Sequence, residues 1–361
     1  MDRKRKRTGL RIFIGIILTL IFAAGGAALY DIYGPGLVRY NVSFDSAGGE
    51  PVDDITVKWH RSAELPVTER KDYTFKGWTL NGVPITSPVS PKADITLTAQ
   101  WEPNSYTVSF DSNGGQDPPA LTLHTGDPLT LPASAGEIPG RRLKGWTDSS
   151  GNTVSDGTVL PCEDITLTAQ WELDIEVRDG VTYVGGILIA NKTYQLPSSY
   201  NPGGLTDECY DAFKKMQNAA SGDGIDLWIV SGFRSYSTQE SIYWRYVGND
   251  GMAEADTYSA RPGHSEHQTG LAMDLNSLDD SFADTPAGRW LEKHGHEYGF
   301  IIRYPRGKQA ITGYIFEPWH VRYLGVDIAI KVYESGLTLE EYLGIDSKYQ
   351  IASAYEQYGR S

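Results

Sequence analysis

Three short stretches in the C-terminal half of the chain carry side chains that could hydrolyse a bond. RPGHSEHQTGLAMDLN contains His267 and Asp274, and FEPWHVRY contains Glu317 and His320. Two imidazole nitrogens and one carboxylate oxygen suit a catalytic Zn²⁺ site, which keeps a fourth position open for water. Glu317, three residues before His320, would then be the spare carboxylate that acts as general base.

The third stretch, SGFRSYSTQE, places Arg234 in a turn after an apolar run. Metal-assisted amide hydrolysis passes through an oxyanion, and the rigid guanidinium fork of arginine binds an oxyanion or a carboxylate well. The ordinary alternative is that His267 and Asp274 form a solvated loop pair. A zinc site is favoured over it because a base adjoins a ligand in EPWH, and because all three stretches fall within one domain-sized span.

His264 lies three residues before His267 and could compete with it as a metal ligand. A role in the loop, or in contact with substrate, is the alternative that we favour. Cys162 and Cys209 are the only cysteines, and they lie in different expected domains, so they make no disulfide framework. A zinc site in this chain would therefore have to be built from histidine and carboxylate.

Together these stretches resemble the VanY-type D-alanyl-D-alanine carboxypeptidases, zinc peptidases of the VanY/VanX type. SGFRSYSTQ, SEHQTGLAMD and EPWH stand in the order of that family, and ANKTYQLPSSYNP at residues 190–202 is similar to its entry segment. The resemblance covers about residues 181–344, under half of the chain. It implies that the substrate is the D-Ala-D-Ala terminus of peptidoglycan stem peptides.

The same resemblance implies a role for seven residues. It assigns the metal to His267, Asp274 and His320, and the catalytic steps to Glu317 and Arg234. It also suggests that Ser265 and Gln239 help to seat the end of the substrate.

The charge balance excludes one large class of partners. The 361 residues carry a net charge of −14, and residues 1–11 hold six of the 32 basic residues but one acidic residue. The rest of the chain therefore has 26 basic against 45 acidic residues, a balance of −19. Nucleic-acid binding needs a basic footprint, so we expect no nucleic-acid partner.

The N-terminus predicts export. Residues 12–30 form an uncharged run long enough to cross a bilayer as a helix, and the basic residues 1–11 precede it. The positive-inside rule places residues 1–11 in the cytoplasm as a basic tail and the later domains outside the cell membrane, on a single-pass anchor. A cleaved signal peptide is the alternative, because residues 23–28 are rich in small side chains.

Two copies of one unit follow the anchor, at residues 38–103 and 104–173. YNVSFDSAGG, KGWT and ITLTAQWE in the first copy match YTVSFDSNGG, KGWT and ITLTAQWE in the second. Their period-two alternation is typical of half-buried strands, and the Gly-Gly pairs predict turns. The copies resemble the InlB B-type (Listeria–Bacteroides) repeat, which implies small β-rich, β-grasp-like modules.

Four tryptophans recur at matched positions in the copies, and we interpret them as core rather than as a carbohydrate-stacking surface: Trp78, Trp101, Trp146 and Trp171. We find no clustered His, Cys or acidic set in either copy. The repeats are therefore expected to act as a spacer, with weak binding as a further option.

Residues 174–347 predict an α+β domain with a small sheet, followed by a tail at residues 348–361. Thr206 is a good N-cap for a helix ending at Gly222, and Thr285-Pro286 starts another. The expected helices are 206–222, 238–247, 285–298, 326–333 and 339–343; the expected strands are 225–230, 271–276, 301–304 and 319–323. In strand 271–276 the alternation puts Asp274 on the side that does not pack.

The whole chain thus predicts a multidomain protein: a transmembrane anchor, two β repeats and a C-terminal zinc peptidase. Its expected reaction is removal of the terminal D-Ala from stem peptides outside the cytoplasmic membrane. The alternatives are a catalytically inactive wall-binding or adhesion protein, and an endopeptidase or D,D-dipeptidase on the same fold. An inactive module has no need of a base, so Glu317 favours the enzyme.

Overall fold

The computed structural model describes residues 38–349. The expected cytoplasmic tail at 1–11, the anchor at 12–30 and residues 350–361 of the expected tail lie outside this range. Within residues 38–349, no helix is both long and apolar enough to cross a membrane.

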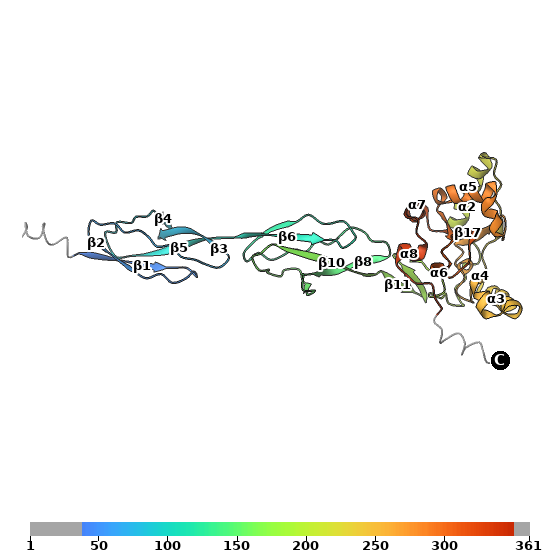
Figure 1. Ribbon diagram of the computed structural model, residues 1–361, viewed down its shortest axis with the longest axis horizontal. Helices are drawn as coiled ribbons and strands as arrows, with labels where there is room; N and C mark the ends of the chain where they lie inside the picture. Colours follow the sequence, from blue (N-terminus) through green and yellow to red (C-terminus); the bar gives the residue numbers. More distant parts are fainter. Residues whose placement is uncertain (1–37, 350–361) are drawn as a thin grey trace, which may run out of the picture. The chain divides into compact units, whose positions relative to one another are not determined.

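Each repeat is one five-stranded sheet, and the two sheets have the same strand order. The first is β2-β1-β5-β3-β4, and in it β1 and β5 run parallel while the other neighbours run antiparallel. The second is β7-β6-β10-β8-β9. Residues 38–173 contain no helix (Figure 1), so the expected β-rich modules are confirmed. The strands are β1 (Arg39–Asp45), β2 (Ile55–Lys58), β3 (Tyr73–Leu80), β4 (Val83–Ile85), β5 (Ile95–Pro103), β6 (Ser105–Asp111), β7 (Leu121–His124), β8 (Arg141–Thr147), β9 (Thr153–Val154) and β10 (Ile165–Leu173).

The Gly-Gly pairs of the two repeats are explained by their neighbours. Gly48 has a φ of +88°, which favours glycine, and a Cβ on Gly49 would lie 2.4 Å from Cζ2 of Trp101. The indole of Trp101 donates a hydrogen bond to the carbonyl of Ser46 at 2.9 Å, so it closes over this turn. Trp171 donates to Ser112 at 2.8 Å in the second repeat. One tryptophan of each repeat is therefore matched to its glycine turn.

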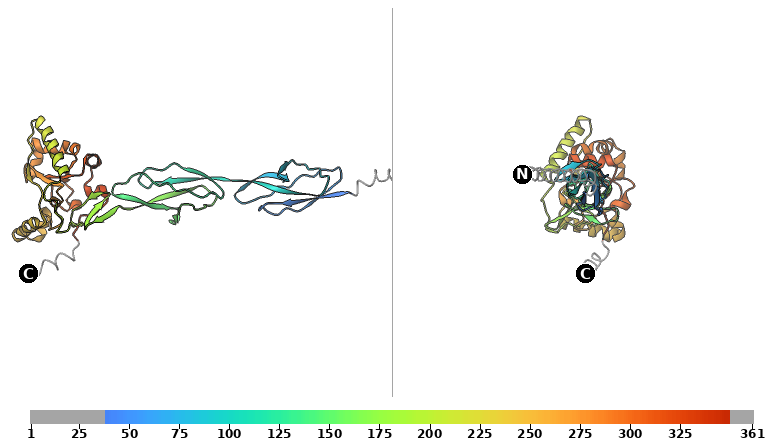
Figure 2. Two further views of the ribbon diagram at one scale, coloured as in Figure 1. Left: turned by 180° about the vertical axis from the view of Figure 1, so that it is seen from behind. Right: turned by 90° about the vertical axis from the view of Figure 1, so that its left-hand side faces the viewer.

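The C-terminal domain begins with a small sheet and continues with helices around a second sheet. The order β11-β12-β13 is followed by the antiparallel sheet β14-β15-β17-β16. Figure 1 shows α2 and α5 beside β17, and α3 and α4 together, and the left view of Figure 2 shows the same helices from behind. The strands are β11 (Ile175–Arg178), β12 (Val181–Val184), β13 (Ile187–Leu188), β14 (Ile229–Ser231), β15 (Ala272–Leu275), β16 (Phe300–Tyr304) and β17 (Glu317–Tyr323). The α-helices are α2 (Asp207–Gly222), α3 (Tyr236–Asp250), α4 (Met252–Tyr258), α5 (Pro286–His294), α6 (Gln309–Thr312), α7 (Val326–Ser335) and α8 (Leu339–Leu343), and the 3-10 helices are η1 (Glu266–Thr269), η2 (Asp280–Asp284) and η3 (Gly295–Tyr298).

Several predicted elements differ in extent from the observed ones. The strand expected at 225–230 is shorter and later, because β14 spans Ile229–Ser231 and Trp228 is half exposed. The helix expected from residue 238 begins at Tyr236, since the N-cap is Ser235, whose hydroxyl accepts from the amide of Thr238. The expected helix at 285–298 is α5 followed by the 3-10 turn η3.

The sheet β14-β15-β17-β16 is covered on both faces. Met273, Leu275 and Val321 pack into an apolar core with side chains of α2 and α5. Asp274 and His320 alternate with them, and each is only 4% exposed. The prediction that Asp274 lies on the unpacked side of its strand is therefore wrong, because the second face is buried by polar groups rather than left in solvent.

Candidate metal centre

Strand pairing brings His320 and Asp274 together. β15 and β17 are neighbours in the antiparallel sheet, and their register places Asp274 directly opposite His320. Cross-strand partners stand close enough for their side chains to interact. His267 reaches the same point from η1, the single turn that precedes β15. His320 is distant in the sequence from His267 and Asp274, yet the candidate ligand atoms of all three side chains lie within 4.8 Å of one another.

An irregular ladder adds Glu317 to this group. Glu317 and His320 are three residues apart, and in a regular strand such residues point to opposite faces. Ile302 of β16 pairs with Val321, but the next pair joins Tyr304 to Glu317, so four steps along β17 match two along β16. Extra residues in one strand of a pair re-aim its side chains. Oε2 of Glu317 consequently lies 3.6 Å from Nδ1 of His320.

The hydrogen bonds around His267 leave one nitrogen for a cation. Its Nδ1 lies 2.7 Å from the carbonyl oxygen of Gly232, which can only accept, so Nδ1 carries the proton. Burial lowers the pKa of His267, which favours the neutral ring. Nε2 then presents a lone pair 3.3 Å from Oδ2 of Asp274, and two acceptors at this distance call for a cation between them.

Asp274 is held as a carboxylate between the two histidines. Burial by itself would raise its pKa, but His267 and His320 outweigh burial and hold the pKa of Asp274 well below its usual range. Oδ1 lies 3.2 Å from Nδ1 of His320 and makes no hydrogen bond of good geometry. A buried carboxylate oxygen without a partner is costly unless a cation satisfies it.

His320 and Glu317 titrate differently from free side chains. Burial lowers the pKa of His320, but Asp274 and Glu266 together raise it to about 9, so a proton supplies positive charge here when no metal is bound. Burial, with a further contribution from Asp274, raises the pKa of Glu317 to about 7. A carboxyl group with a pKa near neutrality can both accept and return a proton.

Arg234 provides a fixed positive charge next to the cluster. Its Nη1 donates to the amide oxygen of Gln239 at 2.8 Å, and its Nη2 donates to Ser231 at 3.0 Å. Both acceptors are neutral, and among the described residues no carboxylate lies within 4.0 Å of this guanidinium. Burial lowers the pKa of Arg234, yet arginine stays charged in proteins. The remaining N–H groups can therefore meet an anionic group of a ligand.

A pocket of about 370 Å³ opens onto these groups. Arg234, His267, Asp274, Glu317 and His320 line it, and so does Ser265, which is 4% exposed. The other lining residues are Ile242, Arg245, Tyr246, Tyr258, Ser259, Ala260, Glu266, Leu278, Tyr304, Tyr314, Ile315 and Trp319. Such a volume accommodates a short peptide end.

Two further residues from the sequence analysis lie outside the metal cluster, and for His264 this agrees with the interpretation that we favoured. Gln239 does not line the pocket; it is 1% exposed, and its amide also donates to the carbonyl of Ala260 at 2.6 Å, so its contact with the site is through Arg234. His264 is outside the cluster, because its Nδ1 lies 2.8 Å from the carbonyl oxygen of Asn191 and its ring meets Tyr349 edge-on.

Glu266 was missed by the sequence analysis. It lies beside His267 in SEH and is 2% exposed, with Oε2 3.6 Å from Nε2 of His320. A carboxylate next to a histidine is common in exposed loops, so the sequence alone does not reveal it. The buried arginines that hold this carboxylate are distant along the chain, which gives no local signal.

The donor set fits a zinc ion. His267, Asp274 and His320 offer two nitrogens and one oxygen, and the fourth side of the cluster faces the pocket. The unpaired Oδ1 of Asp274 and the opposed lone pairs of His267 and Asp274 are satisfied by a cation at one point. No cysteine competes, because Cys209 is buried in the apolar core and Cys162 lies in the second repeat.

Comparisons with known proteins agree with this division of the chain. The family model for VanY, D-alanyl-D-alanine carboxypeptidase, matches residues 203–326. The model of the Listeria–Bacteroides repeat domain matches residues 40–100 and 106–170. Both matches fall where the sequence motifs predicted them and in the predicted order.

Individual relatives cover the C-terminal part of the chain. "Putative carboxypeptidase YodJ" of Bacillus subtilis is 38% identical over 207 residues, which are 50% of this chain and 76% of that protein. A D-alanyl-D-alanine carboxypeptidase of Enterococcus faecalis is 41% identical over 36% of this chain and 52% of its own length. The solved structure of the LdcB LD-carboxypeptidase is 41% identical over 49% of this chain and 98% of its own, with a TM-score of 0.46.

Proposed function

Because the chain belongs to the VanY family of D-alanyl-D-alanine carboxypeptidases, we propose that it is a zinc-dependent D,D-carboxypeptidase. Its substrate is a peptidoglycan stem peptide ending in D-Ala-D-Ala, from which it removes the last D-Ala. The observation that carries this proposal is the cluster of His267, Asp274 and His320 beside a protonatable Glu317.

The zinc ion is proposed at His267, Asp274 and His320. When bound, it supplies the positive charge that makes water acidic enough to attack an amide near neutral pH and that polarises the scissile carbonyl. The chain supplies the geometry of this site, since His267 and Asp274 are fixed by the carbonyl of Gly232 and by the sheet register.

Glu317 is proposed to move the proton. Its pKa of about 7 lets it accept a proton from the attacking water and then give that proton to the leaving amine of D-Ala. Burial is the main cause of this raised pKa, so exclusion of solvent from the pocket and proton transfer depend on the same packing.

Arg234 is proposed to bind anionic oxygen of the substrate. Its guanidinium is oriented by Gln239 and Ser231 while its charge stays unneutralised, as a site for the terminal carboxylate or the developing oxyanion requires. Ser265, on the pocket wall, is proposed to contact the same end of the substrate. Gln239 then contributes by holding Arg234.

The deciding experiment is release of D-Ala by the zinc-loaded full chain from a pentapeptide ending in D-Ala-D-Ala. Glu317→Gln should reduce release by about 10²- to 10⁴-fold with one metal per chain retained. Undiminished release by that variant would overturn the role of Glu317. A chain that binds no zinc and releases nothing would instead be the wall-binding protein.

Three further peptides locate the cleavage within the enzyme class. A tetrapeptide without the last D-Ala tests L,D-carboxypeptidase activity, and a pentapeptide with an amidated C-terminus tests endopeptidase activity. Free D-Ala-D-Ala tests dipeptidase activity. We expect the unblocked pentapeptide to react fastest, because Arg234 can pair with its terminal carboxylate. If another peptide reacts faster, the activity that it tests would replace the proposed D,D-carboxypeptidase activity.

We also propose that residues 12–30 anchor the enzyme in the cytoplasmic membrane with residues 31–361 outside. The support is the uncharged run after the basic residues 1–11. The full chain should remain in the membrane pellet after alkaline extraction, and protease added to spheroplasts should degrade its C-terminal domain. Recovery of the chain without residues 1–30 would indicate a cleaved signal peptide instead.

A further inference from the structure

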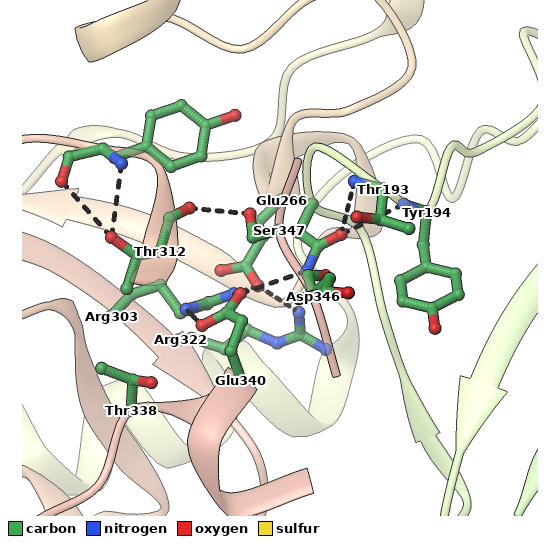
Figure 3. A network of polar contacts seen from close by, with 12 residues as sticks. Thr193, Tyr194, Glu266, Arg303, Thr312, Arg322, Thr338, Glu340, Asp346 and Ser347 are labelled. Atoms are coloured by element: carbon green, nitrogen blue, oxygen red, sulfur yellow. Dashed lines mark hydrogen bonds and ion pairs between the residues drawn. The ribbon is translucent and has the colours of Figure 1, made fainter. Parts of the chain in front are cut away.

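A buried network of two glutamates and two arginines stands behind the candidate metal centre. Glu266, Arg303, Arg322 and Glu340 are each 1–2% exposed. Figure 3 shows the four side chains together: Arg303 pairs with both carboxylates, and Arg322 pairs with Glu266. The four formal charges sum to zero, which is the condition under which such groups can be buried together.

The network assigns the two oxygens of Glu266 to different partners. Arg303 donates through Nε at 2.8 Å and Arg322 donates through Nη1 at 2.9 Å, and both bonds go to Oε1. Oε2 receives no hydrogen bond from either arginine and is buried without a partner of good geometry. One oxygen of this carboxylate is therefore held, and the other is left to face outward from the network.

The outward oxygen faces His320. Oε2 of Glu266 and Nε2 of His320 are 3.6 Å apart, and both are buried polar atoms that otherwise lack a partner. A carboxylate that is held by two guanidinium groups can only accept, so the nitrogen that faces it has to donate. The proton of His320 then sits on Nε2, and Nδ1 carries the lone pair on the side of Asp274 and Glu317.

We propose that Glu266 is the positioning residue of the metal centre: held by Arg303 and Arg322, it fixes His320 in the tautomer whose Nδ1 binds the metal. This inference rests on the proposed zinc site and adds a residue to it. A carboxylate behind a metal-binding histidine orients the ring and strengthens it as a ligand. Glu266 is only 2% exposed at the pocket wall, and in this role it acts on the metal through His320.

Because of this geometry, Glu266→Gln removes a charge and also places a hydrogen-bond donor opposite His320. Arg303 and Arg322 both donate to the Oε1 position, so the amide oxygen of glutamine has to take that place. The amide N–H₂ then occupies the Oε2 position and points a donor at Nε2 of His320. Nε2 is forced to accept, the proton moves to Nδ1, and the nitrogen that faces the metal loses its lone pair.

Glu340 provides the matched control. It accepts from Nη1 of Arg303 at 2.7 Å and from Nδ2 of Asn191 at 3.2 Å, and it has no contact with His320. Glu340→Gln removes the same carboxylate charge from the same arginine at an equally buried place. Any effect that comes only from disturbing the network should therefore be shared by the two variants.

The first measurement is zinc affinity of the full chain, by competition with a chelating dye. We expect Glu266→Gln to bind zinc about 10- to 100-fold more weakly than the parent chain, while Glu340→Gln stays within a small factor of it. Equal weakening in both variants would overturn the proposal, and so would unchanged affinity in Glu266→Gln.

The second measurement needs no variant and therefore survives if Glu266→Gln fails to fold. In the ¹¹³Cd-loaded, ¹⁵N-labelled chain, His320 should show coupling between cadmium and Nδ1 together with a protected proton on Nε2. Coupling through Nε2 would overturn the proposal. Both measurements are made without substrate, so a parent chain that binds metal but releases no D-Ala contradicts the proposed function and leaves this inference testable.

Discussion

The repeats and the C-terminal domain bury different kinds of side chain. Among the described residues 38–173, the buried positions are apolar residues, glycine, proline, threonine and serine, with no charged side chain. The C-terminal domain buries Lys192, Arg303, Arg322, Asp274, Glu266, Glu317 and Glu340 as well as His267 and His320. The repeats are held by packing, whereas the C-terminal domain also holds charges out of water.

This difference shows that the two regions are stabilised by different interactions. Apolar burial gives a stabilisation roughly in proportion to area, without a requirement for a particular partner. A buried charge is costly unless its partner is in place, so each one fixes the position of another. The repeats can therefore be spacers of simple construction, while the C-terminal domain gains a defined set of atoms around a site.

Metal removal should separate the two regions most strongly. At free zinc of about 1,000 times Kd, binding stabilises the folded domain by about 4 kcal/mol, and a chelator should remove this and abolish D-Ala release. Hydrogen exchange read by mass spectrometry should then rise in residues 174–349 and stay constant in residues 38–173. Asp274→Asn should make the domain insensitive to zinc, and the exposed Asp280→Asn serves as control.

An equal response of the repeats to the chelator would contradict this separation. The reason for expecting none is that among residues 38–349 the only group of His, Cys, Asp or Glu arranged for a metal is His267, Asp274 and His320.

Neutralising one cation should cost far more in the C-terminal domain than in a repeat. Arg303→Met leaves Glu340 without its buried arginine and removes one of the two that hold Glu266, and we expect a loss of about 3 to 5 kcal/mol in unfolding free energy. Lys76→Met removes a pair with Glu102 whose side chains are 54% and 59% exposed, and should cost only a small fraction of that loss, because solvent screens exposed ion pairs. Urea unfolding followed by hydrogen exchange in each region gives both values, and similar losses would contradict the comparison.

The sequence predicted the repeats better than it predicted the four-stranded sheet of the C-terminal domain. VSFDS and LTAQW alternate with period two, and the strands that they form bury alternate residues such as Val42 and Leu97. In β15 the same alternation was misleading, since Ala272, Met273, Asp274 and Leu275 are all buried. Period two reports which residues face the apolar core, but it does not tell whether the other face meets water or a buried polar network.

The sequence allowed the residues of the candidate site to be predicted, but not how they are arranged in space. His267, Asp274, His320 and Glu317 were recognisable because metal chemistry needs those types near one another. The approach of Asp274 to His320 depends on the register of β15 with β17, and that of Glu317 depends on the irregular pairing of β16 with β17. Both are relations between strands and leave no mark in EPWH. The role of Glu266 depends on arginines far along the chain, so it emerges only in the folded domain. Gln239 holds Arg234 of its own stretch, a contact that the residue types alone do not reveal.

A steric test of the repeats uses their glycine turns. Gly49→Ala would bring a methyl group 2.4 Å from Trp101 and 2.9 Å from the carbonyl of Glu69, and should cost the first repeat about 2 to 3 kcal/mol. D-Ala release should not change. Gly82→Ala is the control, because Gly82 has a φ of +80° and open space, so it isolates backbone strain at about 1 kcal/mol. A cost no greater than that of Gly82→Ala would show that the turn relaxes easily around the tryptophan.

The smallest expected effect is a pH dependence from the one lysine that the C-terminal domain buries. Lys192 donates to the carbonyl of Asp256 at 2.7 Å, and burial lowers its pKa to about 8, from about 10.5 in the unfolded chain. Between these values the unfolded chain holds this proton and the folded chain has lost it, so this group makes stability rise with pH above about 8.

The contribution of Lys192 is isolated by comparison with Lys192→Met. Since the lysine is partly screened by solvent, we expect the difference in unfolding free energy between parent and variant to grow by about 1 kcal/mol from pH 8 to pH 10. Above pH 10 the buried tyrosines act in the opposite direction, because burial, for example, raises the pKa of Tyr243 well above its usual value. Residues 38–173 bury no lysine, so their protection from hydrogen exchange should be the same in parent and variant. If the difference in unfolding free energy between parent and variant stays constant from pH 8 to pH 10, Lys192 keeps its proton in the folded chain.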